Sequence, residues 1–189
     1  MIWIIIGMVA VFVWAIIVFN GMVGLSKQAD AAWSDIDVQL KRRHDLIPNV
    51  VETVKGYAAH EKNVFIQVTE ARTRAMSAGG PREKGDAEAN LAGSIQKLFA
   101  VAENYPQLRA NENFMGLQKS LTEAEETLQN ARRYYNAVIR DYNIKISVFP
   151  NLLIAPVAGF KPRDYFQLDS AQEAANPKVS MGNEPSSLS

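Results

Sequence analysis

The sequence contains no cysteine among its 189 residues. This absence excludes disulfide bonds, catalytic thiols and zinc sites built on cysteine. Only two imidazoles, His44 and His60, are available for catalysis or metal binding. The 20 basic and 20 acidic side chains cancel, whereas a nucleic-acid-binding protein should carry a basic excess. The composition therefore argues against a nucleic-acid partner.

Charged side chains are also absent from residues 1–25. About 20 apolar residues, at about 1.5 Å each, cross the ~30 Å hydrocarbon core of a bilayer. The 12 Ile, Val and Phe residues between Ile2 and Phe19 favour insertion by about 4 to 7 kcal/mol. A cleaved signal peptide would have a basic residue before a shorter apolar run. We therefore expect an uncleaved single-pass anchor over 1–25 that contacts membrane lipid.

The orientation of the anchor follows from its flanks. No basic side chain precedes the apolar run, whereas Lys27 and then Lys41, Arg42 and Arg43 follow it. Cytoplasmic flanks carry the excess of Lys and Arg. The body of the protein is therefore expected in the cytoplasm.

Beyond the anchor, apolar residues recur at helical spacing and no segment alternates with period two. This pattern predicts an all-α protein, with an antiparallel up-and-down bundle over 26–149. Four helices are expected, at about 27–45, 48–77, 87–104 and 113–149. The glycine, proline and charge of residues 77–90 predict a surface loop between the second and third.

The C-terminal part has a different composition. Residues 150–168 are apolar but interrupted by prolines and a glycine, which predicts a non-helical segment packed on the bundle or on the membrane surface. Residues 169–189 are small and polar, which predicts a disordered tail. A last helix returning toward the membrane would bring aromatic side chains to the bilayer surface, where they are favoured. The candidate membrane contacts are Phe149, Phe160, Tyr165 and Phe166.

Pro48 interrupts the first helical pattern without changing its phase. Either the helix kinks and continues to about residue 77, or it breaks and Pro48 begins a new helix. The break is favoured because it yields pieces that can form a four-helix bundle. The residues predicted to form this joint are His44, Asp45, Pro48 and Asn49, with hydrogen bonds among the polar ones satisfying the backbone groups that Pro48 frees.

The basic residues Lys41, Arg42 and Arg43 form a candidate surface for an acidic partner. Lys41 lies 16 residues beyond the anchor, about 24 Å along a helix, and charges are screened over about 8 Å in physiological salt. Lipid headgroups are therefore out of their reach. A solvated helix face, with i,i+4 ion pairs, is the alternative interpretation.

The sequence lacks recognisable motifs for catalysis or metal binding. His60 has Val64 where a zinc protease needs a second histidine. Lys41 and Tyr57 occupy the positions where a bundle di-iron site needs Glu before each His. We expect no metal, no cofactor, no catalytic residue and no enzymatic activity.

Several long motifs, taken together, closely resemble the LemA family. They are DAAWSDIDVQLKRRHDLIPNVVETVKGYAAHE, VTEAR, LFAVAENYPQLRANENF, LQKSLTEAEETLQNARRYYNAVIRDYN and FPNLLIA with GFKPRDYF, and they cover roughly residues 25–168. The resemblance implies an N-terminal membrane anchor followed by a helical bundle. It implies no established enzymatic activity and suggests a place in the bacterial envelope.

These observations lead to an expected function. The chain is expected to be a membrane-anchored helical scaffold of the bacterial envelope that binds protein partners or other copies of itself. The alternative is a membrane-shaping protein that oligomerises on the bilayer.

Overall fold

The computed structural model describes residues 1–167, and this part of the chain contains helices but no β-strand. The helices are, in chain order, α1 (Ile2–Lys55), α2 (Lys62–Ser77), α3 (Gly80–Glu103), α4 (Pro106–Arg109), α5 (Glu112–Ser147) and α6 (Asn151–Ile154). The predicted all-α class is confirmed. The predicted tail, 169–189, lies outside the described residues.

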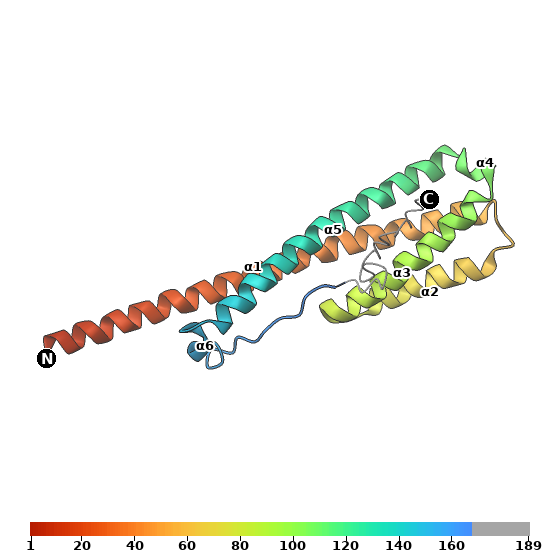
Figure 1. Cartoon of the computed structure of the whole chain (residues 1–189). Coiled ribbons are helices and arrows are strands. Elements are labelled where there is room, and N and C mark those ends of the chain that lie inside the picture. Colours follow the sequence, from red (N-terminus) through yellow and green to blue (C-terminus); the bar gives the residue numbers. More distant parts are fainter. Residues whose placement is uncertain (168–189) are drawn as a thin grey trace, which may run out of the picture.

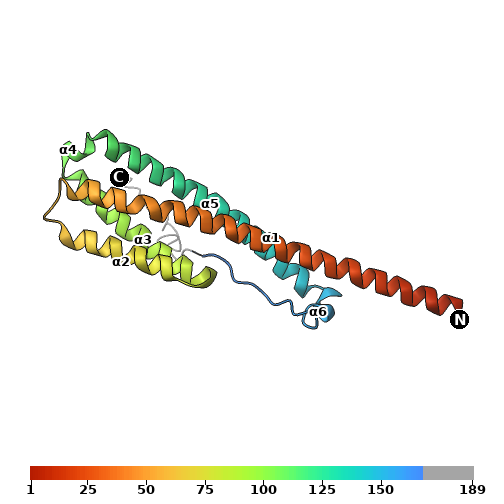
Figure 2. The ribbon, with the colours of Figure 1, turned by 180° about the vertical axis from the view of Figure 1, so that it is seen from behind.

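Four long helices form an up-and-down bundle. α1 runs outward from the N-terminus, α2 returns, α3 runs outward again and α5 returns beyond the end of the α2–α3 pair (Figure 1). Packing is most extensive between α1 and α5 and between α2 and α3. The N-terminal part of α1 extends past every other described element (Figure 2).

This projecting part of α1 coincides with the predicted anchor. Large apolar side chains from Met1 to Phe19 are exposed along it. In the described part of the chain, α1 is the one helix that contains a stretch long and apolar enough to cross a membrane, and that stretch is not buried by the protein. A core helix would bury such a surface, whereas a membrane span presents it to lipid.

The core changes along the bundle. Far from the anchor, all four long helices and α4 contribute to one apolar cluster. In the middle, helical side chains come only from α1 and α5, and Phe166 from the C-terminal segment completes the cluster. Nearest the anchor, Met22 and Tyr142 pack against Ala155 in the turn after α5. The C-terminal segment therefore covers the half of the α1–α5 pair that receives no core side chain from α2 or α3.

Pro48 lies inside α1 and does not break it. The predicted break is therefore wrong, and α1 ends instead at Lys55. A proline removes the hydrogen bond to the carbonyl four residues earlier and costs about 3 kcal/mol in a helix interior. That carbonyl belongs to His44, and it accepts a hydrogen bond of 2.8 Å from Arg72 Nε on α2. A tertiary contact thus replaces the missing local bond, which explains how the helix continues.

The predicted loop over 77–90 is also wrong for most of its length. α2 ends at Ser77 and α3 begins at Gly80. Gly80 has a positive φ of 75° at the turn, a conformation that glycine adopts without strain. A proline follows in the first turn of α3, where its missing donor costs nothing. The same glycine and proline that suggested a loop therefore start a helix.

Candidate functional site

Charged side chains from all four long helices meet inside the bundle near Pro48. We name this cluster the polar node, and its members are Arg43 and His44 on α1, Arg72 on α2, Glu88 on α3 and Glu125 on α5. Glu88 is fully buried, and Arg43 and His44 are nearly so. Charged residues are almost never fully buried unless they are paired, so the pairing decides what the node does.

Both carboxylate oxygens of Glu88 are used. Arg43 Nη1 donates to Oε2 at 2.7 Å, and His44 Nε2 lies 2.6 Å from Oε1. The two contacts place the Glu88 carboxylate between the Arg43 guanidinium and the His44 imidazole. Arg43 Nε also lies 3.1 Å from Glu125 Oε2, within ion-pair distance although without hydrogen-bond geometry. The node therefore joins α1 to α3 and α5 through paired charges.

The geometry of the polar node is that of a structural cross-link. A hollow of about 260 Å³ lies beside His44, but Glu88 is not among its lining residues. Both oxygens of Glu88 already contact partners, Arg43 and His44, and the carboxylate is fully buried. Within the described residues, no group of three His, Asp or Glu side chains is placed to hold a metal ion.

A second polar arrangement holds residues 161–167, which we name the C-terminal strap. Two asparagines of α5, seven residues apart, each bind one strap residue through both of its backbone groups. Asn143 bonds the N–H and C=O of Arg163 at 2.9 Å each. Asn136 does the same with Phe166, at 2.9 and 3.0 Å. The asparagine amides therefore pair with the strap as a neighbouring strand would.

A tyrosine precedes each of these asparagines. The Tyr142 hydroxyl donates to the carbonyl of Lys161 and the Tyr135 hydroxyl to that of Asp164, both at 3.0 Å. Seven helical residues rise about 10.5 Å, and three extended residues span about 10 Å. The repeat along α5 and the repeat along the strap therefore coincide. Burial, partly opposed by the positive charge of Arg163, raises the pKa of Tyr135 to about 12.

Side chains of the strap reach α1. Phe166 is fully buried, with its ring centroid 5.9 Å from that of Trp33. Arg163 donates to Asp30 at 2.6 Å and to Ser26 at 2.9 Å. Burial acts to lower the pKa of the Arg163 guanidinium, but the hydrogen bond and charge of Asp30 outweigh it and raise that pKa. The strap therefore bridges α1 and α5.

The last described residue of the strap lies against α3. A Cβ atom added at Gly85 would overlap the carbonyl oxygen of Gln167. Only glycine lets the two backbones approach this closely. Gly85, within the region predicted as a loop, is therefore a packing position.

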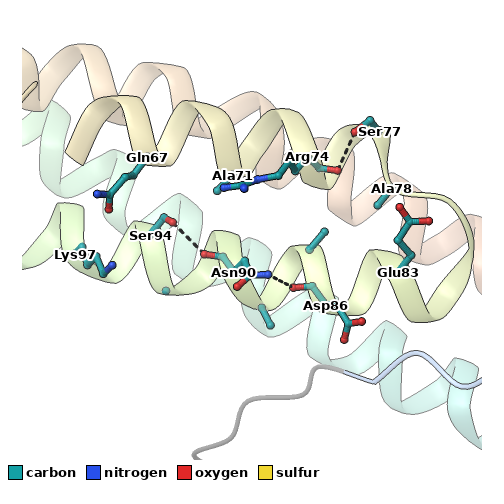
Figure 3. Close-up of a pocket in the computed structure, with 13 residues that line it drawn as sticks. Gln67, Ala71, Arg74, Ser77, Ala78, Glu83, Asp86, Asn90, Ser94 and Lys97 are labelled. Carbon is teal, nitrogen blue, oxygen red and sulfur yellow. Dashed lines mark hydrogen bonds between the residues drawn. The ribbon is translucent and has the colours of Figure 1, made fainter. Parts of the chain in front are cut away.

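A hollow of about 730 Å³ lies between α2 and α3. Figure 3 shows polar side chains along it that turn back to their own helices. Asn90 donates to the Asp86 carbonyl at 3.0 Å, and Ser94 donates to the Asn90 carbonyl at 3.0 Å. The polar groups do not converge on one point, as they would in a site that orients a small substrate.

The structure separates the residues predicted for the joint. His44 faces inward to Glu88, whereas Asp45 and Asn49 are exposed. The predicted hydrogen bonds among these polar residues are not formed, because Arg72 satisfies the freed carbonyl instead. The joint is thus a continuous helix supported from α2.

The predicted basic face is reduced to two residues. Lys41 and Arg42 are exposed, but Arg43 is buried in the polar node and cannot take part in the face. A helix turns about 100° per residue, so Arg43 points about 200° away from Lys41.

The predicted membrane contacts divide in the same way. Phe149 is exposed. Phe160 packs at the end of the anchor, with its ring centroid 5.8 Å from that of Phe19. The prediction that Phe166 contacts lipid is wrong, because its side chain lies in the protein core. Tyr165 is partly exposed, but it is adjacent to Phe166 on the strap and beside the bundle.

Two features were missed from the sequence. The Tyr-Asn pairs at 135–136 and 142–143 were visible as a seven-residue repeat. Glu88 gave no comparable signal, because its importance depends on α3 beginning at Gly80.

The fold and these sites define a class of protein, a helical bundle closed by a C-terminal strap. The bundle is carried on one continuous helix whose N-terminal part is long and apolar enough to cross a membrane. A profile of the LemA family matches residues 32–181. The chain belongs to the LemA family, as its motifs had indicated.

Three relatives are magnetosome proteins. Magnetosome proteins MamQ 2 and MamQ 1 of Paramagnetospirillum magneticum are each 29% identical over 175 residues, which covers 79% of this chain and 64% of the relative. Magnetosome protein MamQ of Magnetospirillum gryphiswaldense is 25% identical over 174 residues, covering 78% and 64%. The chain thus spans less than two thirds of the length of these relatives. The apolar helix and these relatives together support a membrane location.

Proposed function

We propose that this protein is a non-catalytic, membrane-anchored scaffold of the cell envelope, and that its helical body binds another protein. The observation that carries the proposal is the continuity of α1, which serves both as the anchor and as a core helix of the bundle. A flexible linker would let the body turn freely. A continuous helix holds it at a fixed distance and direction from the bilayer.

The polar node supports this interpretation. Its side chains pair with one another between helices, and His44 is the one member that also lines the neighbouring hollow. Enzymes instead place perturbed acids or bases where a substrate can reach them. The names of the magnetosome relatives also refer to a cellular structure and to no reaction.

The surface we expect to contact a protein partner is the hollow between α2 and α3. It lies on the pair of helices farther from the anchor, where a partner can approach without meeting the bilayer (Figure 1). Its lining combines small apolar residues with amides and charges, so a partner that docks there would present complementary polar and charged groups.

Photocrosslinking in native membranes tests the proposal. A photoreactive residue would replace Asn90 or Lys97 in the hollow, and a control would replace Lys119 on α5. We expect crosslinks to a different membrane or envelope protein from the first two positions and not from the control. Equal labelling at all three positions, or none at any, would contradict docking at this hollow. Crosslinks only between copies would identify the partner as the protein itself.

We also propose that the body lies in the cytoplasm, because basic residues follow the anchor and none precede it. Since the chain has no native cysteine, Lys119→Cys can be labelled uniquely. We expect a membrane-impermeant maleimide to label this cysteine only after the cells are lysed. Labelling in intact cells would place the body on the outer side.

Membrane shaping is a second candidate function. One observation favours it, namely the exposed apolar side chains between α5 and the strap, next to the end of the anchor. Purified protein in liposomes would then deform them as its density increases. Round vesicles at high protein density would argue against this role.

A further inference from the structure

The segment that follows α5 has an unusual surface. Between Lys145 and Lys161 the sequence contains no charged side chain. We name residues 148–160 the apolar turn. Its large exposed side chains are Val148, Phe149, Leu152, Leu153 and Val157. Its one polar amide, Asn151, is buried and donates to the Lys145 carbonyl at 2.7 Å. The outer surface of the turn is therefore apolar.

The apolar turn packs on α1 where the membrane span ends. Ala155 lies in one cluster with Met22, and the rings of Phe160 and Phe19 are in edge-to-face contact. A hydrocarbon core of about 30 Å takes about 20 helical residues. Counted from the start of α1, this core ends near Gly21. The level of Phe19 and Phe160 is thus at the edge of the hydrocarbon.

The backbone of the turn suits the same environment. Lipid offers no hydrogen-bonding partners, so backbone polar groups must be satisfied within the protein. Six backbone N–H groups of the turn donate to carbonyls within it, those of Leu152, Leu153, Ala155, Ala158, Gly159 and Phe160. The prolines at 150 and 156 have no N–H to satisfy. Few donors remain that would resist transfer into the interface.

Positive charges border the turn on both sides. Lys145 packs against Gly21 of α1, and Lys161 begins the strap. Lysines at this level extend their amino groups to the phosphates while their stems remain in apolar surroundings. Both flanks of the turn therefore suit the headgroup layer.

We propose that the apolar turn is a second membrane-inserting element, which enters only the leaflet next to the body, and that lipid tails cover Phe149, Leu152, Leu153 and Val157. The proposal rests on the membrane anchoring included in the proposed function. The anchor and the turn then occupy this leaflet together, whereas the opposite leaflet holds the anchor alone. The protein thus has a wedge-shaped cross-section in the bilayer, and its body is fixed in tilt as well as in distance.

Fluorescence quenching in vesicles tests the insertion. The full chain would be reconstituted in phosphatidylcholine with a minority of phosphatidylglycerol, and a cysteine at one position would carry an environment-sensitive nitrobenzoxadiazole label. Leu153→Cys and Val157→Cys probe the turn. The matched control Val38→Cys lies on α1 in the body and is 62% exposed, against 66% for Leu153. Val9→Cys reports insertion of the anchor.

We expect labels at positions 153 and 157 to emit at shorter wavelength than the label at 38. We also expect lipids spin-labelled near the headgroup to quench them several-fold more strongly than the label at 38. The proposal would be overturned if aqueous iodide quenched the labels at positions 153 and 157 as strongly as the label at position 38. If spin-labelled lipid still quenched the label at position 9, the anchor would be unaffected by this result. A label at 9 that lipids fail to quench would instead refute the anchor, and with it both proposals.

Discussion

The two halves of the α1–α5 pair are completed in different ways. Far from the anchor, α2 and α3 cover the pair. The polar node joins α1 to α3 through buried side chains, to α5 through Glu125 and to α2 through a hydrogen bond from Arg72. Near the membrane, an extended strap covers the same two helices and is held by side-chain bonds to its backbone. The difference shows that one helix pair can be completed by helices or by seven residues of extended chain. The second solution depends on repeated side chains on α5.

Glu88→Ala should cause the largest effect in this comparison. The substitution removes the buried carboxylate that Arg43 and His44 share and leaves only the half-exposed Glu125 near Arg43. Breaking a buried ion pair costs about 3 to 5 kcal/mol. Denaturant unfolding in detergent would measure the loss. Glu123→Ala, at an exposed position of α5, is the control and should change stability by less than about 0.5 kcal/mol. Equal stabilities for the two variants would show that the node contributes nothing to holding the helices.

Phe166→Ala should cost about 3 kcal/mol within the strap, because it removes a fully buried aromatic side chain. Only the half of the bundle nearest the anchor should lose protection against hydrogen exchange. Hydrogen exchange should therefore accelerate at the amides of the strap and remain unchanged in α2 and α3. Tyr165→Ala, which changes the neighbouring partly exposed side chain, is the matched control. Faster exchange throughout the bundle would show that the two halves unfold as one unit.

Asn143→Ala tests the asparagine repeat alone. It removes the two hydrogen bonds to Arg163, worth about 1 to 2 kcal/mol together. Asn136→Ala should behave alike, because the two sites are equivalent. The exposed Asn130→Ala should leave strap exchange unchanged. If only one of the first two variants loosens the strap, the equivalence is wrong.

The stability of the folded protein should also depend on pH through Tyr135, and this effect should be smaller than those above. Its pKa is raised from 10.0 to about 12 in the folded protein, so folding favours the neutral phenol. The associated stability is complete below pH 10 and is lost as the pH rises toward 12. Tyr135→Phe should reduce the fall in melting temperature across this window. Tyr134→Phe, a substitution of the exposed neighbour, should not. Identical pH profiles for Tyr135→Phe and the original chain would contradict the burial of this hydroxyl.

Local patterns predicted much of the fold. The absence of charge before residue 26 identified the anchor, and the apolar spacing of 113–149 identified α5 to within two residues at each end. Both signals are summed over many residues, so one unusual residue changes little. At Pro48 and over 77–90 the signal rested on one or two residues whose cost depends on their neighbours.

The candidate sites were harder to predict for the same reason. The basic run 41–43 was visible, but helix geometry directed Arg43 inward and left Lys41 outside. Phe166 looked like an interfacial aromatic until the strap placed it between α1 and α5. In each case the decisive partner, Glu88 or Trp33, lies far away in the chain.

The sequence by itself determined that this protein is helical, that residues 1–25 are long and apolar enough to cross a membrane and that it belongs to the LemA family. Those properties depend on local periodicity, composition and long motifs. The tertiary structure alone decided that α1 continues through Pro48, that Arg43 and Phe166 are buried, and that the apolar side chains of the turn are exposed beside the anchor. A local penalty of a few kcal/mol is overcome when another helix supplies the missing hydrogen bond, and that bond exists only in the folded chain.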